Sequence, residues 1–357
     1  MSEVNYRKQY ELFGVNFDHW ERESDVSDAS SILKLLQNAG NNFAKDEDVQ
    51  LELKKFNPSW ALGKNKNSRK KASKVQFHQL STINCCRTIY LSRDILTAIK
   101  RSELYSADSL CYITDISQKD HFHKLCSALD YFGYTDIAAK IEFVGFGKLE
   151  GMSTRAGTGL SLESVIDEAV ELQAEMMEKH GKTTYARHNF DQLDEITKKK
   201  HAAWFVAASV FSSKRQKDLK FNWQLHLKND NGMYLQRTYS KIKNLLSKVE
   251  RSRLEESVDD ADFSSFIYES HWNELLQQSA AYSKARQKAI DELDGFILLQ
   301  FGLRLGQLAH KVIFKDEKWI LIEDRKSLHE RIMLFDCVLM IVEDLLKLLG
   351  YQPSDQF

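Results

Sequence analysis

The sequence predicts an α/β protein in which a partial Rossmann-type parallel sheet is followed by an all-α helical bundle. Short apolar runs alternate with helix-spaced segments between residues 75 and 150, which is typical of strand–helix–strand units in a parallel sheet. From residue 161 onward, the apolar residues recur with the helical period. The chain contains only two prolines, Pro58 and Pro353, which favours long helices because proline breaks a helix interior.

The bulk composition indicates an ordinary globular chain that is long enough for two domains. Of its 357 residues, 43% are hydrophobic and 28% are charged, which argues against intrinsic disorder. The formal net charge is −1, so no overall attraction draws the chain to nucleic acid. Any nucleic-acid site must therefore come from a local patch of cations.

The cysteines and the apolar runs indicate a protein of a reducing, cytoplasmic compartment. The five cysteines form no C-x-x-C pair, so neither a zinc ribbon nor a disulfide framework is predicted, and no metal site is expected. The N-terminus carries no apolar stretch and no presequence pattern. The apolar run at 332–342 is interrupted by Asp336 and is too short to cross a bilayer of about 30 Å. We therefore expect no membrane partner.

The first 75 residues carry few strong signals. Residues 1–56 are predicted to open with a helix, and Ser27 is a candidate cap for the apolar segment at 32–36. The stretch 61–74 is basic and poor in apolar residues, which predicts a loop. A solvated loop and a phosphate-contacting loop are both compatible with this stretch.

Residues 88–146 supply the predicted sheet. Three short runs have the composition of strands, and the two segments between them have helical spacing. Parallel strands need crossover connections of this kind, so the pattern favours a parallel arrangement. The predicted strands are 88–91, 110–114 and 141–146, and the predicted helices are 95–105 and 122–132.

The remainder of the chain is predicted to be helical. A helix at 163–180 opens after Ser161, which is a preferred capping residue. The acidic run within 255–262 is predicted to be a solvated loop, and Gly350 is predicted to end the last helix. We expect the chain to be complete at this end. Four further helices, at 234–249, 275–291, 296–308 and 328–349, would form a bundle.

A glycine-rich segment follows the third predicted strand and ends in Met152, Ser153, Thr154, Arg155, Ala156 and Gly157. Small residues and glycine let backbone amides approach a phosphate. The segment resembles the signature loop of arginyl-tRNA synthetases, which reads Met-Ser-Thr-Arg-Lys-Gly and handles ATP. Further matches stand in the order that this family uses: Tyr90 to Asp94, Gln118 and His121-Phe122 upstream, and Phe221, Trp223, Leu227 and Tyr234-Leu235-Gln236 downstream.

The resemblance implies three segments. Residues 1–160 correspond to the C-terminal half of a class I synthetase catalytic domain, 161–230 to a connecting helical region, and 231–357 to a DALR-type anticodon-binding helical domain. The sequence contains no His-x-Gly-His motif, which the family carries in the first half of its catalytic domain. The chain therefore resembles a family member without that half, and we expect the loss to be at the front.

The resemblance assigns Tyr90, Asp94 and Gln118 to a remnant of the arginine pocket. A carboxylate can bind a guanidinium through a charge-assisted hydrogen bond, an amide can match its geometry, and an aromatic face can stack on it. Tyr90 and Asp94 are four residues apart, so a strand end followed by a helical turn would bring them onto one side. The alternative is that Tyr90 packs under the sheet while Asp94 caps the helix that starts near Ile95.

The resemblance also assigns ATP to the loop of Met152, Ser153, Thr154, Arg155 and Gly157. A cation in this loop stabilises the charge that develops on the phosphates during the reaction. Ala156 stands where the family has a lysine, so ATP binding is expected to be weak. The alternative is an ordinary glycine-rich turn between a strand and a helix.

Cations and aromatic residues near the start of the predicted bundle are the candidate tRNA contacts. Cations on a helix face with interleaved aromatic residues suit an RNA backbone and a stacked base. For any single lysine, a solvated helix face is the alternative. The residues concerned are Lys214, Arg215, Tyr234, Gln236, Arg237 and Lys241.

The expected function is that of an arginyl-tRNA synthetase-like protein that binds tRNA(Arg) and is not catalytically competent alone. The absent motif removes donors from a phosphoryl-transfer site, and each such contact is typically worth about 3–4 kcal/mol. The alternative is arginine–tRNA ligase activity, either residual or restored by a separate N-terminal half. A third alternative is a truncated gene product without independent activity. The expected partners are tRNA and either a protein partner or the missing half.

Overall fold

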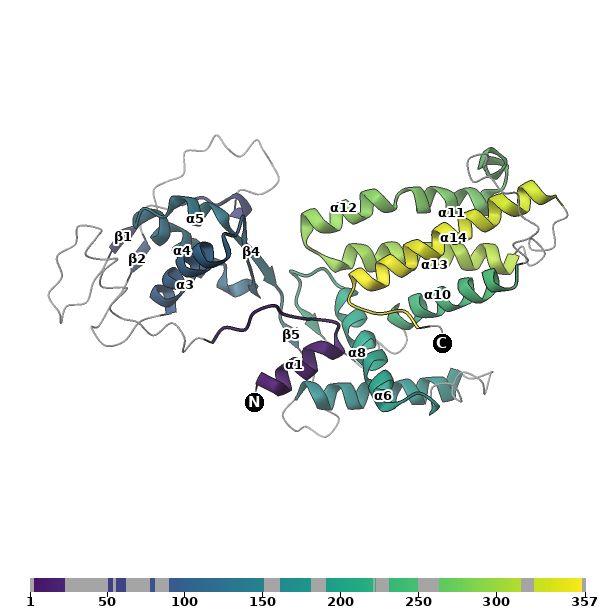
Figure 1. Ribbon diagram of the computed structural model, residues 1–357, viewed down its shortest axis with the longest axis horizontal. Coiled ribbons are helices and arrows are strands. Elements are labelled where there is room, and N and C mark those ends of the chain that lie inside the picture. Colours follow the sequence, from purple (N-terminus) through teal and green to yellow (C-terminus); the bar gives the residue numbers. More distant parts are fainter. Residues whose placement is uncertain are drawn as a thin grey trace. The chain divides into compact units, whose positions relative to one another are not determined.

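The chain divides into two compact units in a computed structural model (Figure 1). We call residues Phe17–Lys148 the sheet unit, and residues Met1–Asn16 with Leu149–Phe357 the helical unit. The predicted boundaries at 160/161 and 230/231 stay predictions. The structure describes residues 3–22, 51–53, 56–61, 78–80, 90–150, 161–180, 191–220, 222, 231–249, 263–315 and 324–354.

The sheet unit contains two parallel strands. β3 (Leu110–Asp115) pairs with β4 (Ile141–Phe146) in parallel along the full length of both strands. The chain between them forms a short 3₁₀ helix and two α-helices, which confirms the predicted strand–helix–strand arrangement. A second pair of strands, β1 and β2, is antiparallel. The other elements of the unit are β1 (Leu51–Leu53), η2 (Ser59–Ala61), β2 (His78–Leu80), α3 (Tyr90–Tyr105), η4 (Ile116–Gln118), α4 (Lys119–Tyr131) and α5 (Thr135–Lys140).

Helix α3 packs through one apolar face. Leu91, Ile95, Ala98 and Ile99 recur at the spacing of a helical face, and all four are buried. They belong to the same core as Leu125 of α4, which is fully buried. Full burial of one such aliphatic side chain stabilises the fold by about 1.5–3 kcal/mol. The charged residues of α3 are therefore left on its remaining surface, where the pocket described below is found.

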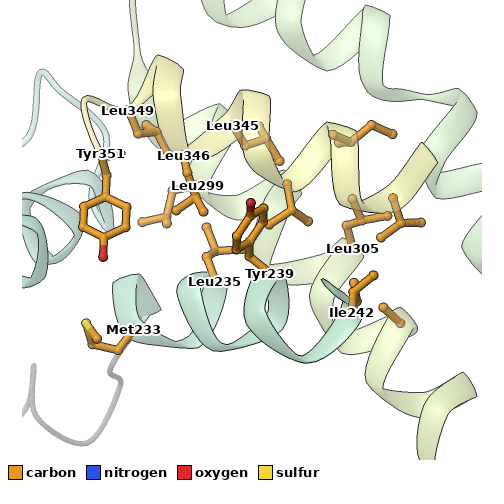
Figure 2. Close-up of a cluster of buried hydrophobic side chains, with 14 of the residues drawn as sticks. Met233, Leu235, Tyr239, Ile242, Leu299, Leu305, Leu345, Leu346, Leu349 and Tyr351 are labelled. Carbon is orange, nitrogen blue, oxygen red and sulfur yellow. The ribbon is translucent and has the colours of Figure 1, made fainter. Parts of the chain in front are cut away.

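Part of the core of the helical unit lies between α10, α13 and α14 (Figure 2). Leu235, Tyr239 and Ile242 supply the side of α10 that faces this core, and all three are buried. The short strands β5 (Leu149–Glu150) and β6 (Leu219–Lys220) pair in parallel. The helices are α1 (Glu3–Leu12), α6 (Leu162–His180), α8 (Glu195–Phe211), α10 (Asn231–Ser247), η6 (Phe263–Tyr268), α11 (Ser270–Ala280), α12 (Tyr282–Glu292), α13 (Gly295–Lys315) and α14 (Arg325–Leu348).

The segment after α14 folds back onto the bundle. Gly350 has a φ of 89°, and its N–H donates to Lys347 O while the N–H of Tyr351 donates to Leu346 O. This left-handed turn confirms the predicted end at Gly350. Tyr351 is buried, forms a 2.6 Å hydrogen bond with His201 Nδ1, and stacks on Trp204 at 5.1 Å between ring centroids.

Several predicted boundaries are confirmed. The predicted strand 141–146 has the same bounds as β4, and the predicted strand 110–114 lies within β3. Ser161 Oγ accepts a hydrogen bond from the N–H of Ser164, as expected of the residue that begins α6. The helices predicted at 234–249, 296–308 and 328–349 correspond to α10, α13 and α14, within a few residues except that α13 is longer.

Two predicted elements are wrong. The helix predicted at 275–291 is broken at Ala281, and α11 and α12 lie on either side of it. The strand predicted at 88–91 is not formed at its described end, because Tyr90 and Leu91 are the first residues of α3. Leu91 continues the apolar spacing of Ile95 and Ala98, so burial of that face extends the helix backward.

Some predicted features lie outside the described residues. These are Ser27 with the segment 32–36, nearly all of the basic stretch, the glycine-rich loop at 152–157, the residues Phe221, Trp223 and Leu227, and the acidic run within 255–262. In the part of the chain that the structure describes, no helix combines the length and apolar character that a membrane span requires.

Candidate functional site

A pocket of about 230 Å³ lies on the polar surface of α3. Tyr90 and Asp94 line it together, because they are one helical turn apart. Tyr90 is 75% exposed, so it does not pack under the sheet, and Asp94 lies inside α3 rather than at its cap. We call this site the α3 pocket, and its lining residues are Glu21, Arg22, Tyr90, Arg93, Asp94, Thr97 and Arg101.

The Asp94 carboxylate forms a hydrogen bond with a residue of a neighbouring helix. Its Oδ2 lies 2.6 Å from Nε2 of His121, which belongs to α4. A carboxylate at this distance accepts a strong hydrogen bond from an imidazole. Gln118, the third residue assigned to the arginine-pocket remnant, is exposed at the N-cap of α4 and does not line the α3 pocket.

The second carboxylate of the α3 pocket is paired as well. Glu21 Oε2 accepts hydrogen bonds from Nε and Nη2 of Arg101 at 2.9 and 2.7 Å, and Tyr105 OH donates to Oε1 at 3.3 Å. Burial raises the pKa of Glu21, but the hydrogen bond and charge of Arg101 outweigh this effect and leave the pKa below its ordinary value. Arg101 also lies over the ring of Tyr112 at 5.7 Å.

A cationic surface lies on α10. Tyr234, Arg237 and Lys241 are spaced three and then four residues apart, so they share one helical face. Arg237 and Lys241 are exposed, and the ring of Tyr234 lies against His310 of α13 at 5.4 Å. We call Tyr234, Arg237, Lys241 and His310 the α10 surface.

Gly306 allows the two helices of this surface to approach each other. A Cβ atom at Gly306 would lie 2.9 Å from the ring of Tyr234 and 3.1 Å from Thr238 Oγ1. Such contacts are closer than side chains normally tolerate, so any larger residue would displace Tyr234. The position of Tyr234 therefore depends on a glycine in the neighbouring helix.

The positive charges on the α10 surface repel one another. Burial, and then the charges of Lys241 and Arg237, lower the pKa of His310 from 6.5 to about 4. Burial and then the charge of Arg237 lower the pKa of Lys241. Neighbouring cations thus disfavour further positive charge here, and His310 is neutral at pH 7. A negatively charged group placed on this surface would relieve the repulsion.

Two of the residues predicted to contact tRNA form hydrogen bonds inside the fold. Gln236 is fully buried, and its side-chain amide hydrogen-bonds Ser240 Oγ and both the N–H and the carbonyl of Ser354. Arg215 donates from Nε to Leu293 O at 2.9 Å and from Nη2 to Glu292 O, at the C-terminal end of α12. A cation that binds the last carbonyls of a helix stabilises that helix end.

The role of all six residues in tRNA binding stays a prediction. Burial leaves the Gln236 amide without access to a tRNA in this arrangement. Lys214 is exposed, like Arg237 and Lys241. The sequence did not single out His310 or Arg101, because His310 contacts Tyr234 and Arg101 contacts Glu21, which lie far away along the chain. The ATP loop of Met152 to Gly157 lies outside the described residues.

Two family models match the chain. The model described as "tRNA synthetases class I (R), catalytic domain" matches residues 81–223, and the model described as "DALR anticodon binding domain" matches residues 235–357. The first match covers the α3 pocket except for Glu21 and Arg22, and the second covers the α10 surface except for Tyr234.

Curated relatives carry the name arginine–tRNA ligase. The chain is 29% identical to the "Arginine--tRNA ligase" of Clostridioides difficile over 98% of its length, and 24% identical to the mitochondrial one of Saccharomyces cerevisiae over 99%. It is 26% identical over 99% of its length to the human "Probable arginine--tRNA ligase, mitochondrial". The chain spans about half the length of these relatives, covering 57%, 52% and 57% of them, respectively.

Solved structures of the same kind share the fold. The chain matches the arginyl-tRNA synthetase of Plasmodium falciparum with a TM-score of 0.71 and 16% identity, over 100% of this chain and 57% of that one. It matches the Thermus thermophilus arginyl-tRNA synthetase with a TM-score of 0.72 and 15% identity, over 97% and 61%, respectively. At this level of identity the structural match establishes the fold.

Proposed function

We propose, from the premise that this chain belongs to the arginyl-tRNA synthetase family, that it binds tRNA, and tRNA(Arg) in particular, through the α10 surface. The helical region that carries most of this surface matches the DALR anticodon-binding model. Because the chain spans about half the length of its relatives, their ligase activity is a separate proposal.

The observation that carries this proposal is the crowding of cations on the α10 surface. Lys241 and Arg237 are exposed on one helical face, and both depress the pKa of His310. Like charges held together destabilise the free protein, and they gain interaction energy when a phosphate lies between them. A negatively charged backbone is the partner that such a surface favours.

The aromatic residue of the α10 surface suits an RNA ligand. The Tyr234 ring is held in place by His310 and Gly306, so little side-chain freedom remains to be lost on binding. Stacking of a base on an aromatic ring is worth about 1–3 kcal/mol. Arg237 can bind a phosphate through two parallel N–H donors. Together these groups would contact one phosphate and one neighbouring base.

We further propose that these 357 residues do not aminoacylate tRNA alone. The sequence has no His-x-Gly-His motif, and Ala156 removes a cation from the loop assigned to ATP. The alternative is arginine–tRNA ligase activity, residual or complemented by an N-terminal half, and the match of residues 81–223 to the class I catalytic model favours it. ATP would then bind the loop at 152–157.

The test of the tRNA proposal is equilibrium binding of the purified chain to tRNA(Arg) and to an unrelated tRNA at physiological salt. We expect tighter binding of tRNA(Arg), and a loss of at least ten-fold in Arg237→Glu. The matched control is Lys288→Glu, the same charge change at another exposed position of the bundle. Equal affinity for both tRNAs, or equal losses in both variants, would contradict the proposal.

The test of the enzyme alternative is aminoacylation by the chain alone and by the chain mixed with the N-terminal half of a relative. We expect no arginylated tRNA from the chain alone. Turnover by the chain alone would establish ligase activity in these residues. Turnover that needs the added half would identify this chain as one part of a complemented enzyme.

A further inference from the structure

We infer that a second pocket, on α8, binds a small zwitterion, namely a free α-amino acid with a hydrocarbon side chain such as leucine. The pocket has a volume of about 120 Å³ and lies within the helical unit. We call it the α8 pocket. Its lining comes from the end of α1 (residues 11–14), one face of α8 (residues 200–207) and the turn after α14 (residues 349–352) (Figure 1).

The α8 pocket is separate from the sites described above. It shares no residue with the α3 pocket or with the α10 surface. The inference therefore goes beyond the proposed function, and the two can fail separately.

The first argument is the apolar floor of the α8 pocket. Lys200, Ala203, Trp204 and Ala207 share one face of α8, because they are spaced three, one and three residues apart. Ala203 and Trp204 are buried, and the two alanines leave space that a longer side chain would fill. A cavity of about 150 Å³ holds a benzene molecule, so the α8 pocket suits one ring or one branched hydrocarbon group.

The second argument is the pair of opposite charges at the mouth of the pocket. Glu11 and Lys200 both line it, and both are exposed. Within the described part of the chain, neither side chain forms an ion pair or a hydrogen bond. A ligand that carries one ammonium and one carboxylate group can pair with both, whereas a singly charged ligand can pair with only one. The mouth therefore favours a zwitterion.

The third argument is that the walls of the pocket are fixed without a ligand. Gly14 and Gly350 have φ values of 69° and 89°, and a Cβ atom on Gly14 would overlap the carbonyl oxygen of Gly350. The turns after α1 and α14 are thus packed backbone against backbone. Tyr351 is held by its hydrogen bond to His201 and by its stacking on Trp204. A pocket formed in advance loses little conformational freedom when a ligand binds.

The experiment is isothermal titration calorimetry of the full chain with four ligands at equal ionic strength. L-leucine is the probe, 4-methylpentanoate is leucine without its ammonium group, 3-methylbutylamine is leucine without its carboxylate, and glycine lacks the hydrocarbon side chain. We expect saturable binding of L-leucine and none of glycine. Each singly charged analogue should bind about five-fold more weakly, because an exposed ion pair contributes up to about that factor.

Three results of this titration would overturn the inference. One is the absence of saturable L-leucine binding. Another is an analogue that binds as tightly as L-leucine, which would mean that the two charges do not act together. The third is equal binding of glycine, which would mean that the apolar floor contributes nothing.

Variants locate the binding. Glu11→Gln and Lys200→Gln should each weaken L-leucine about five-fold, whereas Lys8→Gln, at an exposed position of α1 outside the pocket, should leave it unchanged. Glu11→Gln should not weaken 4-methylpentanoate, because that ligand has no ammonium group. Ala207→Leu should abolish binding, because the added hydrocarbon fills the pocket, and Ala207 is only partly buried.

Circular dichroism of each variant checks that it is folded, and the two charge variants alter exposed side chains only. L-leucine binding that is unchanged in both charge variants, or unchanged in folded Ala207→Leu, would place the site elsewhere and overturn the assignment.

Discussion

The α3 pocket and the α10 surface both contain arginine or lysine side chains, but the cations of the pocket lie beside carboxylates, whereas those of the α10 surface lie beside one another. In the α3 pocket, a hydrogen bond of 2.6 Å holds Asp94 against His121, and an ion pair of 2.7 Å holds Glu21 against Arg101. On the α10 surface, the charges that shift the pKa of His310 are those of other cations. Paired charges fix the geometry of a site, whereas crowded like charges favour an external partner.

The largest effect should come from reversing the charge of the α10 surface. In the double variant Arg237→Glu, Lys241→Glu, we expect tRNA affinity to fall by about a hundred-fold and the salt slope to fall by about two. The free energy of unfolding should stay within about 0.5 kcal/mol, because both side chains are exposed. Filter binding across a salt series and urea unfolding measure the two quantities. A large loss of stability would mean that these cations are structural, like the pairs of the α3 pocket.

Breaking an ion pair of the α3 pocket should lower the stability of the protein and leave its tRNA affinity unchanged. Arg101→Ala removes the 2.7 Å pair with Glu21 and the contact over the Tyr112 ring. We expect the free energy of unfolding to fall by about 1–2 kcal/mol, since both interactions are partly exposed. Affinity for tRNA should not change. Urea unfolding of this variant beside Lys124→Ala gives the difference, and equal values would show that the pair contributes nothing measurable.

Arg215, whose side chain binds carbonyl groups of the fold, can be compared with Arg237, which we propose to bind tRNA. Arg215→Ala removes the hydrogen bonds to the carbonyls of Glu292 and Leu293, so we expect a loss of about 1 kcal/mol in stability. We expect no change in tRNA affinity of the folded protein. Lys217→Ala, two residues away and exposed, is the matched control. Weaker tRNA binding in Arg215→Ala alone would restore this arginine to the interface.

The smallest effect concerns the pH dependence that His310 imposes. Its pKa is about 4 in the folded chain against 6.5 ordinarily, so the unfolded chain binds a proton that the folded chain does not. Stability is therefore lost as pH falls from about 6.5 toward 4. Because the ring is only half-buried, we expect about 1 kcal/mol of this loss to be absent in His310→Gln. Urea unfolding of both proteins at pH 7 and pH 5 measures it, since the buried His201 is common to both.

Elements with a strong local signal could be predicted from the sequence, whereas features set by distant contacts could not. Strand 141–146 stands out because it is a short apolar run between helix-spaced segments. The same kind of run at 88–91 is wrong for Tyr90 and Leu91, because short apolar runs suit helices and strands alike. The break at Ala281 could not be predicted, because no glycine or proline lies beside it in the sequence.

In the candidate sites too, local spacing could be predicted from the sequence, whereas contacts between distant residues could not. The shared position of Tyr90 and Asp94 follows from their spacing, although their role stays a prediction. Gln236 looks like a polar residue on an exposed helix, but its amide holds Ser354, which lies 118 residues away. His310 enters the α10 surface only because Gly306 brings α13 close to Tyr234. Neither contact has a local signature.

Helix α10 packs into the core and carries the proposed tRNA surface on adjacent residues, and this limits how its sequence can vary. Leu235 and Gln236 are buried, whereas the next residue, Arg237, is exposed. Each residue advances a helix by about 100°, so one inserted or deleted residue would rotate every later side chain by that angle. Arg237 or Lys241 would then turn toward the core, and a leucine would turn toward solvent. Natural variation in this helix should therefore accumulate as substitutions on its exposed face, while insertions and deletions are confined to the segments on either side.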